Sequence, residues 1–265
     1  MTSLDTRKTL AVDICRTAGD LALSYFSDRA GLRVDSKGAQ DWVSDADREV
    51  ELHVRKRLSE ALPQDGIFGE EGAPTPGTSG YDWVIDPIDG TTNFVHGIPA
   101  WTVVLACVHE GRTVIGVIHD PLHNETYVAT AGGGATLNGV PLALDPDKGF
   151  ASGTVGVGYS NRVKAQNLLP VIEGLMATGA MIHRNASGAL SLAYVAAGRL
   201  LGYVEEHMNA WDCLAGQLLV AEAGGRVEPQ DVNAMIKDGG RVVVSGPAVF
   251  DDLVTLADAA WGRPT

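Results

Sequence analysis

The chain has 265 residues, with 33 acidic and 20 basic side chains and a formal net charge of −13. Proteins that bind nucleic acid need a basic patch for phosphates, so this balance argues against a nucleic-acid partner and against a polybasic membrane anchor. No apolar run approaches the roughly 18 residues that a membrane span needs, so we expect no membrane contact. The three widely spaced cysteines predict buried, reduced thiols in a cytoplasmic protein.

The N-terminal region predicts two helices followed by a sheet. Apolar residues at steps of three and four indicate a helix over about the first 28 residues and a second one between Ser44 and Pro63. Residues 72–80 hold two prolines and three glycines, which is typical of an exposed loop. Apolar runs at 83–85, 101–108, 114–118 and 127–129 predict strands. The first of these strands is expected to end at Asp86, because Pro87 cannot donate to a strand ladder.

The C-terminal region alternates between the two kinds of element. Strands are expected at 154–157, 201–205 and 241–245, and helices at 163–177, 187–197, 212–223 and 248–260. The stretch near 145–150 is the expected boundary between two halves of one compact unit. Residues 1–145 form an N-terminal α+β half with most candidate ligands, and residues 146–265 form a C-terminal α/β half.

The densest group of candidate functional residues lies in the segment 83–94, WVIDPIDGTTNF. Asp86 and Asp89 are two carboxylates at a turn, and the carbonyl of Ile88 lies between them. Carboxylate and carbonyl oxygens are the ligands that Mg²⁺ prefers. Gly90 and Thr91 then offer backbone N–H groups at an expected helix start, which suits an anion. Metal ligands beside an anion site predict a phosphate ester, whereas a purely structural turn is the alternative for so short a motif.

Three further carboxylates could belong to the same site. Glu70 lies between glycines after an apolar pair, where a solvated turn is the alternative reading. Asp212 begins an expected helix, and Asp47 follows Ser44 in a capping-box pattern, so each could simply cap a helix. So many carboxylates would repel a phosphate ester unless divalent cations neutralise them. The charge therefore favours a metal-dependent site.

Four segments together closely resemble the inositol monophosphatase family over nearly the whole chain: GEE at 69–71, DPIDGTTNFVHG at 86–97, WDCLAG at 211–216 and EAGG at 222–225. The resemblance implies an α+β fold, a layered α-β-α-β-α sandwich of the inositol monophosphatase/fructose-1,6-bisphosphatase type, usually assembled as a homodimer. It also implies a lithium-sensitive phosphomonoesterase with two or three Mg²⁺ ions per active site. A metal-activated water would hydrolyse inositol monophosphate to inositol and phosphate.

The resemblance also implies the metal-site residues. The first metal would be held by Glu70, Asp86 and the carbonyl of Ile88, and the second by Asp86, Asp89 and Asp212. Glu70 would also contact a third, weaker ion and act in catalysis. Thr91, paired with Asp47, would orient and activate the attacking water.

The substrate residues follow from the same resemblance. Gly90 and Thr91 would bind the phosphate, and Asp212 would contact both metal and substrate. The loop of Ala186, Ser187 and Gly188 would line the alcohol pocket, and Glu205 would contact a substrate hydroxyl. Lys37 and Asp41 resemble a mobile segment that closes over the metals. Ala186 departs from the pattern, since many relatives have glycine there, and this leaves the alcohol open.

The same chemistry could act on other esters: histidinol phosphate, 3′-phosphoadenosine 5′-phosphate or fructose 1,6-bisphosphate. The segment DGTTNF at 89–94 favours the inositol branch. Nucleotidases more often have Lys-Glu-Phe after Gly-Thr, and fructose bisphosphatases more often have the sequence Gly-Ser-Ser. Histidinol phosphatases share most of the motifs. A catalytically silent member with a binding or regulatory role is an alternative of another class.

Overall fold

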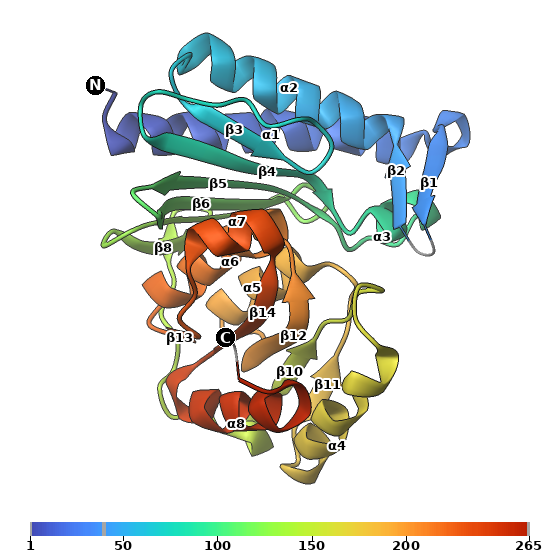
Figure 1. The fold of residues 1–265 in the computed structure, drawn as a ribbon, viewed down its shortest axis with the longest axis vertical. Helices are drawn as coiled ribbons and strands as arrows, with labels where there is room; N and C mark the ends of the chain where they lie inside the picture. Colours follow the sequence, from blue (N-terminus) through green and yellow to red (C-terminus); the bar gives the residue numbers. More distant parts are fainter. Residues whose placement is uncertain (1, 39–40, 264–265) are drawn as a thin grey trace.

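The computed structural model describes residues 2–38 and 41–263, which stack in five layers (Figure 1). Helices α1 (Leu4–Ser27) and α2 (Asp45–Ala61) cover the outer face of a seven-stranded sheet. Helices α5 (Gly188–Ala196) and α6 (Ala210–Glu222) lie between this sheet and a five-stranded one. Helices α4 (Leu169–Ala177) and α8 (Phe250–Trp261) cover the far face. The predicted α-β-α-β-α sandwich is confirmed.

The seven-stranded sheet has the order β3-β4-β5-β6-β7-β8-β9 and is antiparallel except for the β3–β4 pair. Its strands are Gly66–Gly69, Tyr81–Asp89, Thr102–His109, Arg112–Asp120, Glu125–Thr130, Gly134–Leu137 and Val140–Pro141. The five-stranded sheet has the order β11-β10-β12-β14-β13. In chain order, its strands are β10 Thr154–Val157, β11 Met181–His183, β12 Gly202–Met208, β13 Arg226–Val227 and β14 Gly240–Ser245.

Shorter elements complete the chain. Strands β1 (Val34–Gly38) and β2 (Asp41–Ser44) form a separate antiparallel ribbon that leads into α2. Helix α3 (Thr91–His96) follows β4 directly, and α7 (Val232–Asp238) precedes β14. The ribbon and α3 therefore both lie next to the end of β4, where the acidic motif is.

Two apolar layers flank the seven-stranded sheet and a third lies under α4 and α8. Trp83, Phe94 and Trp101 are fully buried on the side of α1 and α2. All three cysteines are buried and free, as predicted, and burial raises the pKa of the Cys15 thiol. Within residues 2–38 and 41–263, no helix is long and apolar enough to cross a membrane.

The expected end of strand β4 at Asp86 is wrong. The strand continues through Pro87 to Asp89, but its pairing with β5 passes directly from Asp86 to Asp89. Pro87 therefore lies in a bulge, where a missing N–H removes no ladder hydrogen bond. The bulge turns Asp86 and Asp89 toward the same region instead of opposite faces of the sheet.

The helix expected over 163–177 is shorter in the structure. It begins at Leu169, with Pro170 in its first turn, and only a short 3₁₀ turn at 165–167 precedes it. Proline is favoured at the start of a helix because it has no N–H to leave unpaired and its backbone is preset. The preceding residues mix polar side chains with Val163, Ala165 and Leu168, and they form turns and not a continuous helix.

Close packing sets the position of α6. A Cβ on Gly116 of β6 would lie 2.7 Å from the carbonyl oxygen of Ala215 and 2.9 Å from its Cα. Only glycine allows the helix backbone to approach the sheet this closely. The N-terminal turn of α6, with Asp212, is thereby held against the end of β4.

Candidate metal centre and adjoining pocket

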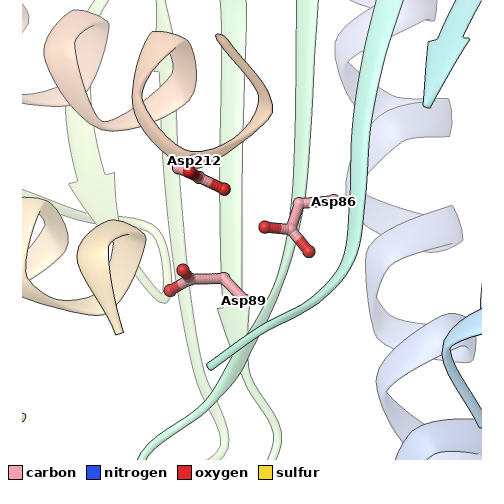
Figure 2. A group of neighbouring side chains, drawn as sticks. All are labelled: Asp86, Asp89 and Asp212. Carbon is pink, nitrogen blue, oxygen red and sulfur yellow. The ribbon is translucent and has the colours of Figure 1, made fainter. Parts of the chain in front are cut away.

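Three carboxylates from two distant parts of the chain meet between the end of β4 and the first turn of α6. Asp86 and Asp89 extend from the end of β4, and Asp212 extends from the first turn of α6. Each offers an oxygen, and these oxygens all lie within 4.8 Å of one another. Figure 2 shows the three carboxyl groups close together beside the first turn of α6. The structure thus brings together three of the predicted metal ligands.

The electrostatics of this cluster favour a cation. Burial raises the pKa of Asp86 well above its usual range, and the negative charges of Glu70, Asp89 and Asp212 add to the effect. Burial likewise raises the pKa of Asp89 to about 7 and raises that of Asp212. Carboxylates that resist ionisation side by side are stabilised when a divalent cation is among them. The donor set is oxygen, so these residues fit Mg²⁺.

Thr91 links the acidic motif to α2. Gly90 precedes it with a φ of +94°, a left-handed conformation that glycine adopts without strain, and α3 begins at Thr91. The Thr91 hydroxyl lies 3.0 Å from the carbonyl oxygen of Ile88 and 3.1 Å from Asp47 Oδ1. It therefore contacts both the predicted carbonyl ligand and the predicted water-activating carboxylate.

Asp47 forms the capping box considered for it, and it also contacts Thr91. Its Oδ2 accepts hydrogen bonds from the Ser44 backbone N–H at 2.7 Å and the Ser44 hydroxyl at 2.6 Å, which completes the capping box of α2. Its Oδ1 remains for Thr91. Burial raises the pKa of Asp47 to about 6. The capping bonds thus fix the carboxylate in place for its second contact.

Glu70 lies beside the cluster but outside the group of three. Its backbone N–H donates to the carbonyl of Ile85 at 3.2 Å, and its negative charge raises the pKa of Asp86. The side chain is partly buried. The structure thus places Glu70 next to Asp86, as the predicted first metal site requires.

A buried glutamate holds the Glu70 loop. Glu51 of α2 is 2% exposed, and its two carboxylate oxygens accept hydrogen bonds, each 2.8 Å long, from the backbone N–H groups of Glu71 and Gly72. Arg55 donates to Glu51 at 2.6 Å and to the Gly72 carbonyl at 3.0 Å. No motif identifies Glu51. Its spacing of four residues from Asp47 on one helix is the local signal that both face the site.

Asp89 is held by the N-terminal end of α5. Its Oδ1 accepts from the Gly188 N–H at 3.2 Å, and its Oδ2 accepts from the Ala189 N–H at 3.0 Å and from the Ser187 hydroxyl. Ala186 has a φ of +59°, in the left-handed region that favours glycine. The predicted pocket loop thus also orients a predicted ligand.

A pocket of about 420 Å³ opens beside the carboxylates. Its wall includes the predicted residues Asp89, Ala186, Ser187, Gly188, Glu205 and Asp212. Burial raises the pKa of Glu205 to about 7, and the Tyr203 hydroxyl donates to its Oε2 at 2.6 Å. Tyr203, Arg162 and Arg184 also line the pocket, and no motif points to them. The side chains of Lys37 and Asp41 lie outside the described part of the structure.

The comparisons with known proteins agree with this geometry. The model of the inositol monophosphatase family matches residues 3–259. The inositol-1-monophosphatase of Rhizobium meliloti is 41% identical, with 78% of this chain and 79% of that protein covered. The Nus factor SuhB of Pseudomonas aeruginosa is 36% identical, with 93% of each chain covered.

Solved structures show the same fold. The extragenic suppressor protein suhB of Bartonella henselae superposes with a TM-score of 0.88 at 32% identity, with 94% of this chain and 97% of that chain covered. The Thermotoga maritima IMPase gives a TM-score of 0.83 at 29% identity, with 96% and 98% covered. The family match over residues 3–259 spans both sheets and every segment that contributes to the acidic cluster.

Proposed function

Because this chain belongs to the inositol monophosphatase family, we propose that it is a Mg²⁺-dependent phosphomonoesterase that hydrolyses inositol monophosphate to inositol and phosphate. The observation that carries the proposal is the convergence of Asp86, Asp89 and Asp212 beside a pocket of about 420 Å³. A site of this kind can hold a phosphate by cations and an alcohol by the pocket wall. Relatives named inositol-1-monophosphatase support the substrate.

The residues of the site have separate roles in the proposed reaction. Two or three Mg²⁺ ions held by Glu70, Asp86, the Ile88 carbonyl, Asp89 and Asp212 would neutralise the phosphate charge and lower the pKa of a bound water. Thr91 Oγ would take a proton from the attacking water while its own hydroxyl proton moves to Asp47 Oδ1, 3.1 Å away, so that Asp47 ends in the protonated form. The backbone N–H groups of Gly90 and Thr91 bind phosphate oxygens. No protein side chain becomes phosphorylated in this mechanism.

The alcohol pocket recognises the rest of the substrate. Ala186, Ser187 and Gly188 form one wall, and Glu205 accepts a hydrogen bond from a substrate hydroxyl. The Tyr203 hydroxyl donates to one oxygen of Glu205, and this hydrogen bond orients the carboxylate and therefore its second oxygen as well. This arrangement suits a hydroxyl-rich alcohol.

The experiment is phosphate release from inositol 1-phosphate, histidinol phosphate, fructose 1,6-bisphosphate and 3′-phosphoadenosine 5′-phosphate, with Mg²⁺ and with EDTA or Li⁺. We expect EDTA-sensitive and lithium-sensitive hydrolysis that is fastest with inositol 1-phosphate. A preference for another ester would replace the named substrate but keep the phosphatase. If none of the four esters is hydrolysed while Mg²⁺ still binds, a non-catalytic role would be favoured. Relatives named Nus factor SuhB make such a role the second candidate function.

We also propose a homodimer in the cytoplasm. The edge strand β11 and the neighbouring helix α4 expose three large apolar side chains, Leu169, Met176 and Met181, each more than 60% accessible. An exposed sheet edge with adjacent apolar side chains is a suitable surface for a second copy. The buried free thiols suit a reducing compartment.

A further inference from the structure

The loop before α5 holds an alanine in a backbone conformation that alanine disfavours. Ala186 has a φ of +59°, and the other described non-glycine residues with a positive φ are Glu110, Asn124 and Asn138. Those three lie in short turns between paired strands, whereas Ala186 lies in the wall of the pocket. Left-handed backbone at a residue with a Cβ persists only where the surrounding contacts hold it. The contacts beside Ala186 therefore indicate what fixes this wall.

Asn93 of α3 provides the contact that precedes Ala186. Asn93 is 3% exposed, and the proposed reaction gives it no role. Its Nδ2 donates to the carbonyl oxygen of Asn185 at 2.6 Å and to the carbonyl oxygen of Ala100 at 2.7 Å. Both hydrogens of one side-chain amide are thus used, and they join two loops that lie far apart in the sequence.

The two loops that Asn93 joins pack against the proposed phosphate-binding turn. A Cβ on Gly90 would lie 2.9 Å from the Ala100 carbonyl oxygen and 3.3 Å from the Cβ of Ser187. The amide of Asn93 therefore fixes the loop of Ala186 relative to the turn that would bind the phosphate. The position of this loop in turn decides where the alcohol part of an ester can lie.

A second attachment follows Ala186. The Ser187 backbone N–H donates to Asn185 Oδ1 at 3.0 Å, and the Ser187 hydroxyl donates to Asp89 Oδ2. The loop is thus attached to α3 through Asn93 and to the acidic motif through Asp89, with Ala186 between the two attachments. Loss of the first attachment would let Ala186 relax toward a negative φ, while the second would still hold Asp89.

We propose that Asn93 is a positioning residue that keeps Ala186 in its left-handed conformation and thereby shapes the pocket wall for the alcohol part of the substrate. The inference rests on the proposed phosphatase activity and deepens it, because it assigns part of the selectivity for the alcohol to a residue behind the loop. The metal ligands keep their own contacts, so loss of Asn93 should affect binding of the alcohol more than cleavage of the phosphate.

The test uses Asn93→Leu, which keeps a branched side chain of similar size but removes both donor hydrogens. The two substrates are inositol 1-phosphate and 4-nitrophenyl phosphate, whose alcohol part carries no further hydroxyl. His96→Gln changes an exposed residue of the same helix and is the first control. Gln217→Leu removes a buried amide of α6 that donates to Gln230, and it controls for lost stability. Phosphate release gives kcat and KM, and calorimetry gives the Tm.

We expect Asn93→Leu to raise KM for inositol 1-phosphate about tenfold, with kcat and both constants for 4-nitrophenyl phosphate changed less than about threefold. Asn93→Ser, whose hydroxyl has one donor hydrogen in place of two, is measured in parallel and should change KM in the same direction. Gln217→Leu should lower the Tm without this difference between the esters, and His96→Gln should change neither. Equal losses on both esters, or an unchanged KM, would overturn the positioning role.

A second variant tests the link to Ala186. Ala186→Gly in the Asn93→Leu background should recover most of the KM, because glycine adopts the left-handed conformation without strain. A crystal structure of Asn93→Leu should show Ala186 outside the left-handed region, and an unchanged Ala186 would overturn the inference whether or not an ester is hydrolysed. If the wild type hydrolyses neither ester, the proposed function fails, and this structure still decides the role of Asn93.

Discussion

Three aspartates with predicted roles in the site also hold the starts of helices. Asp47 caps α2, Asp212 accepts the Asn209 N–H at the start of α6 at 3.2 Å, and Asp89 accepts two N–H groups at the start of α5. Helix N-termini stabilise a negative charge, so each helix favours the ionised form that the acidic cluster disfavours. The helix caps thus hold the carboxylates in position and offset part of their mutual repulsion.

Replacement of Asp89 by asparagine tests the cluster. Asp89→Asn keeps the volume but removes a ligand charge, so phosphate release should fall by at least about a hundredfold while the fold is retained. The measurement is Mg²⁺-dependent turnover, with circular dichroism to check folding. Asp82→Asn, on the same strand but outside the cluster, is the matched control. Near-normal turnover of Asp89→Asn would contradict the metal site.

Thr91→Ala tests the proton path. The variant removes the hydroxyl that contacts Asp47 and Ile88, so kcat should fall about a hundredfold, while the Mg²⁺ concentration for half-maximal activity changes little. Thr91→Ser retains the hydroxyl and should recover most of the activity. If Thr91→Ala altered only the Mg²⁺ requirement, its role would be to hold the carbonyl ligand and not the water.

The predictable part of the site is the part that lies in short contiguous motifs. Asp86 and Asp89 are recognisable because a strand, a turn and a helix start follow one another within a few residues. Asp212 has its own motif, although the helix begins two residues earlier than expected, with Asn209 as N-cap. Glu51, Tyr203 and Arg184 act through tertiary contacts with segments far away in sequence, and local residue spacing contains little information about those contacts.

At the scale of elements, α2 supports the site from two successive turns. Asp47 contacts Thr91, and Glu51, one turn later, binds the loop that holds Glu70. A Cβ on Gly69 would lie 2.3 Å from a Glu51 oxygen, so the loop backbone must be glycine there to approach the carboxylate. One helix therefore sets the distance between the predicted general base and a predicted metal ligand.

Glu51→Gln should disturb both stability and metal use. Its amide offers one acceptor oxygen in place of two, so one loop N–H loses its partner, and the free energy of unfolding should fall by about 2 kcal/mol. The Mg²⁺ concentration for half-maximal activity should rise, because the Glu70 loop is held less firmly. Urea unfolding and Mg²⁺ titrations measure the two effects. Glu49→Gln, exposed on the same helix, should leave both unchanged, and an unchanged Mg²⁺ requirement in Glu51→Gln would contradict its positioning role.

The long helices and strands can be predicted from apolar periodicity, whereas the short ones cannot. Helices α1 and α2 and strands β5 and β6 bury one or both faces along their length, and the pattern is visible in the sequence. Strands β9, β11 and β13 have two or three residues and exist because neighbouring strands pair with them. The extension of β4 past Pro87 likewise depends on a bulge in its pairing with β5.

At the scale of the whole molecule, the buried carboxyls of the candidate site make the metal-free fold sensitive to pH. Burial raises the pKa of Asp47 to about 6 and the pKa values of Asp89 and Glu205 to about 7. These carboxyls hold protons in the folded protein at pH values where the unfolded chain has lost them. The unfolded state then binds fewer protons, so the free energy of unfolding falls as the pH rises from about 4 to 7.

The Tm in EDTA should therefore be lower at pH 7.5 than at pH 5.5. Asp89→Asn, which removes one of the raised carboxyls, should show a smaller difference between the two pH values. Addition of Mg²⁺ at pH 7.5 should recover the Tm of the wild type more than that of the variant. Differential scanning calorimetry makes the comparison. A wild-type Tm that rises with pH in EDTA would contradict the proposed origin of the pH dependence.

The proposed dimer can be tested independently of activity. Glutamates in place of Met176 and Met181 put charges on the exposed surface of α4 and β11, so the double variant should sediment as a monomer near 27.8 kDa, whereas the wild type sediments at about twice that mass. Val140→Glu, equally exposed on the other sheet, is the control and should remain dimeric. A double variant that still dimerises would place the interface elsewhere.

The position of Asp212 relative to Asp89 has a consequence for the chain as a polymer. Residues 90–211 separate the two carboxylates, yet their oxygens lie within 4.8 Å. A cation bound between them would act as a removable cross-link that closes a loop of more than a hundred residues. Such a link restricts the fluctuations of the two sheets relative to each other without any covalent bond. Chelation would then release this restraint as well as removing the proposed cofactor, so proteolytic susceptibility between the sheets should vary with cation concentration.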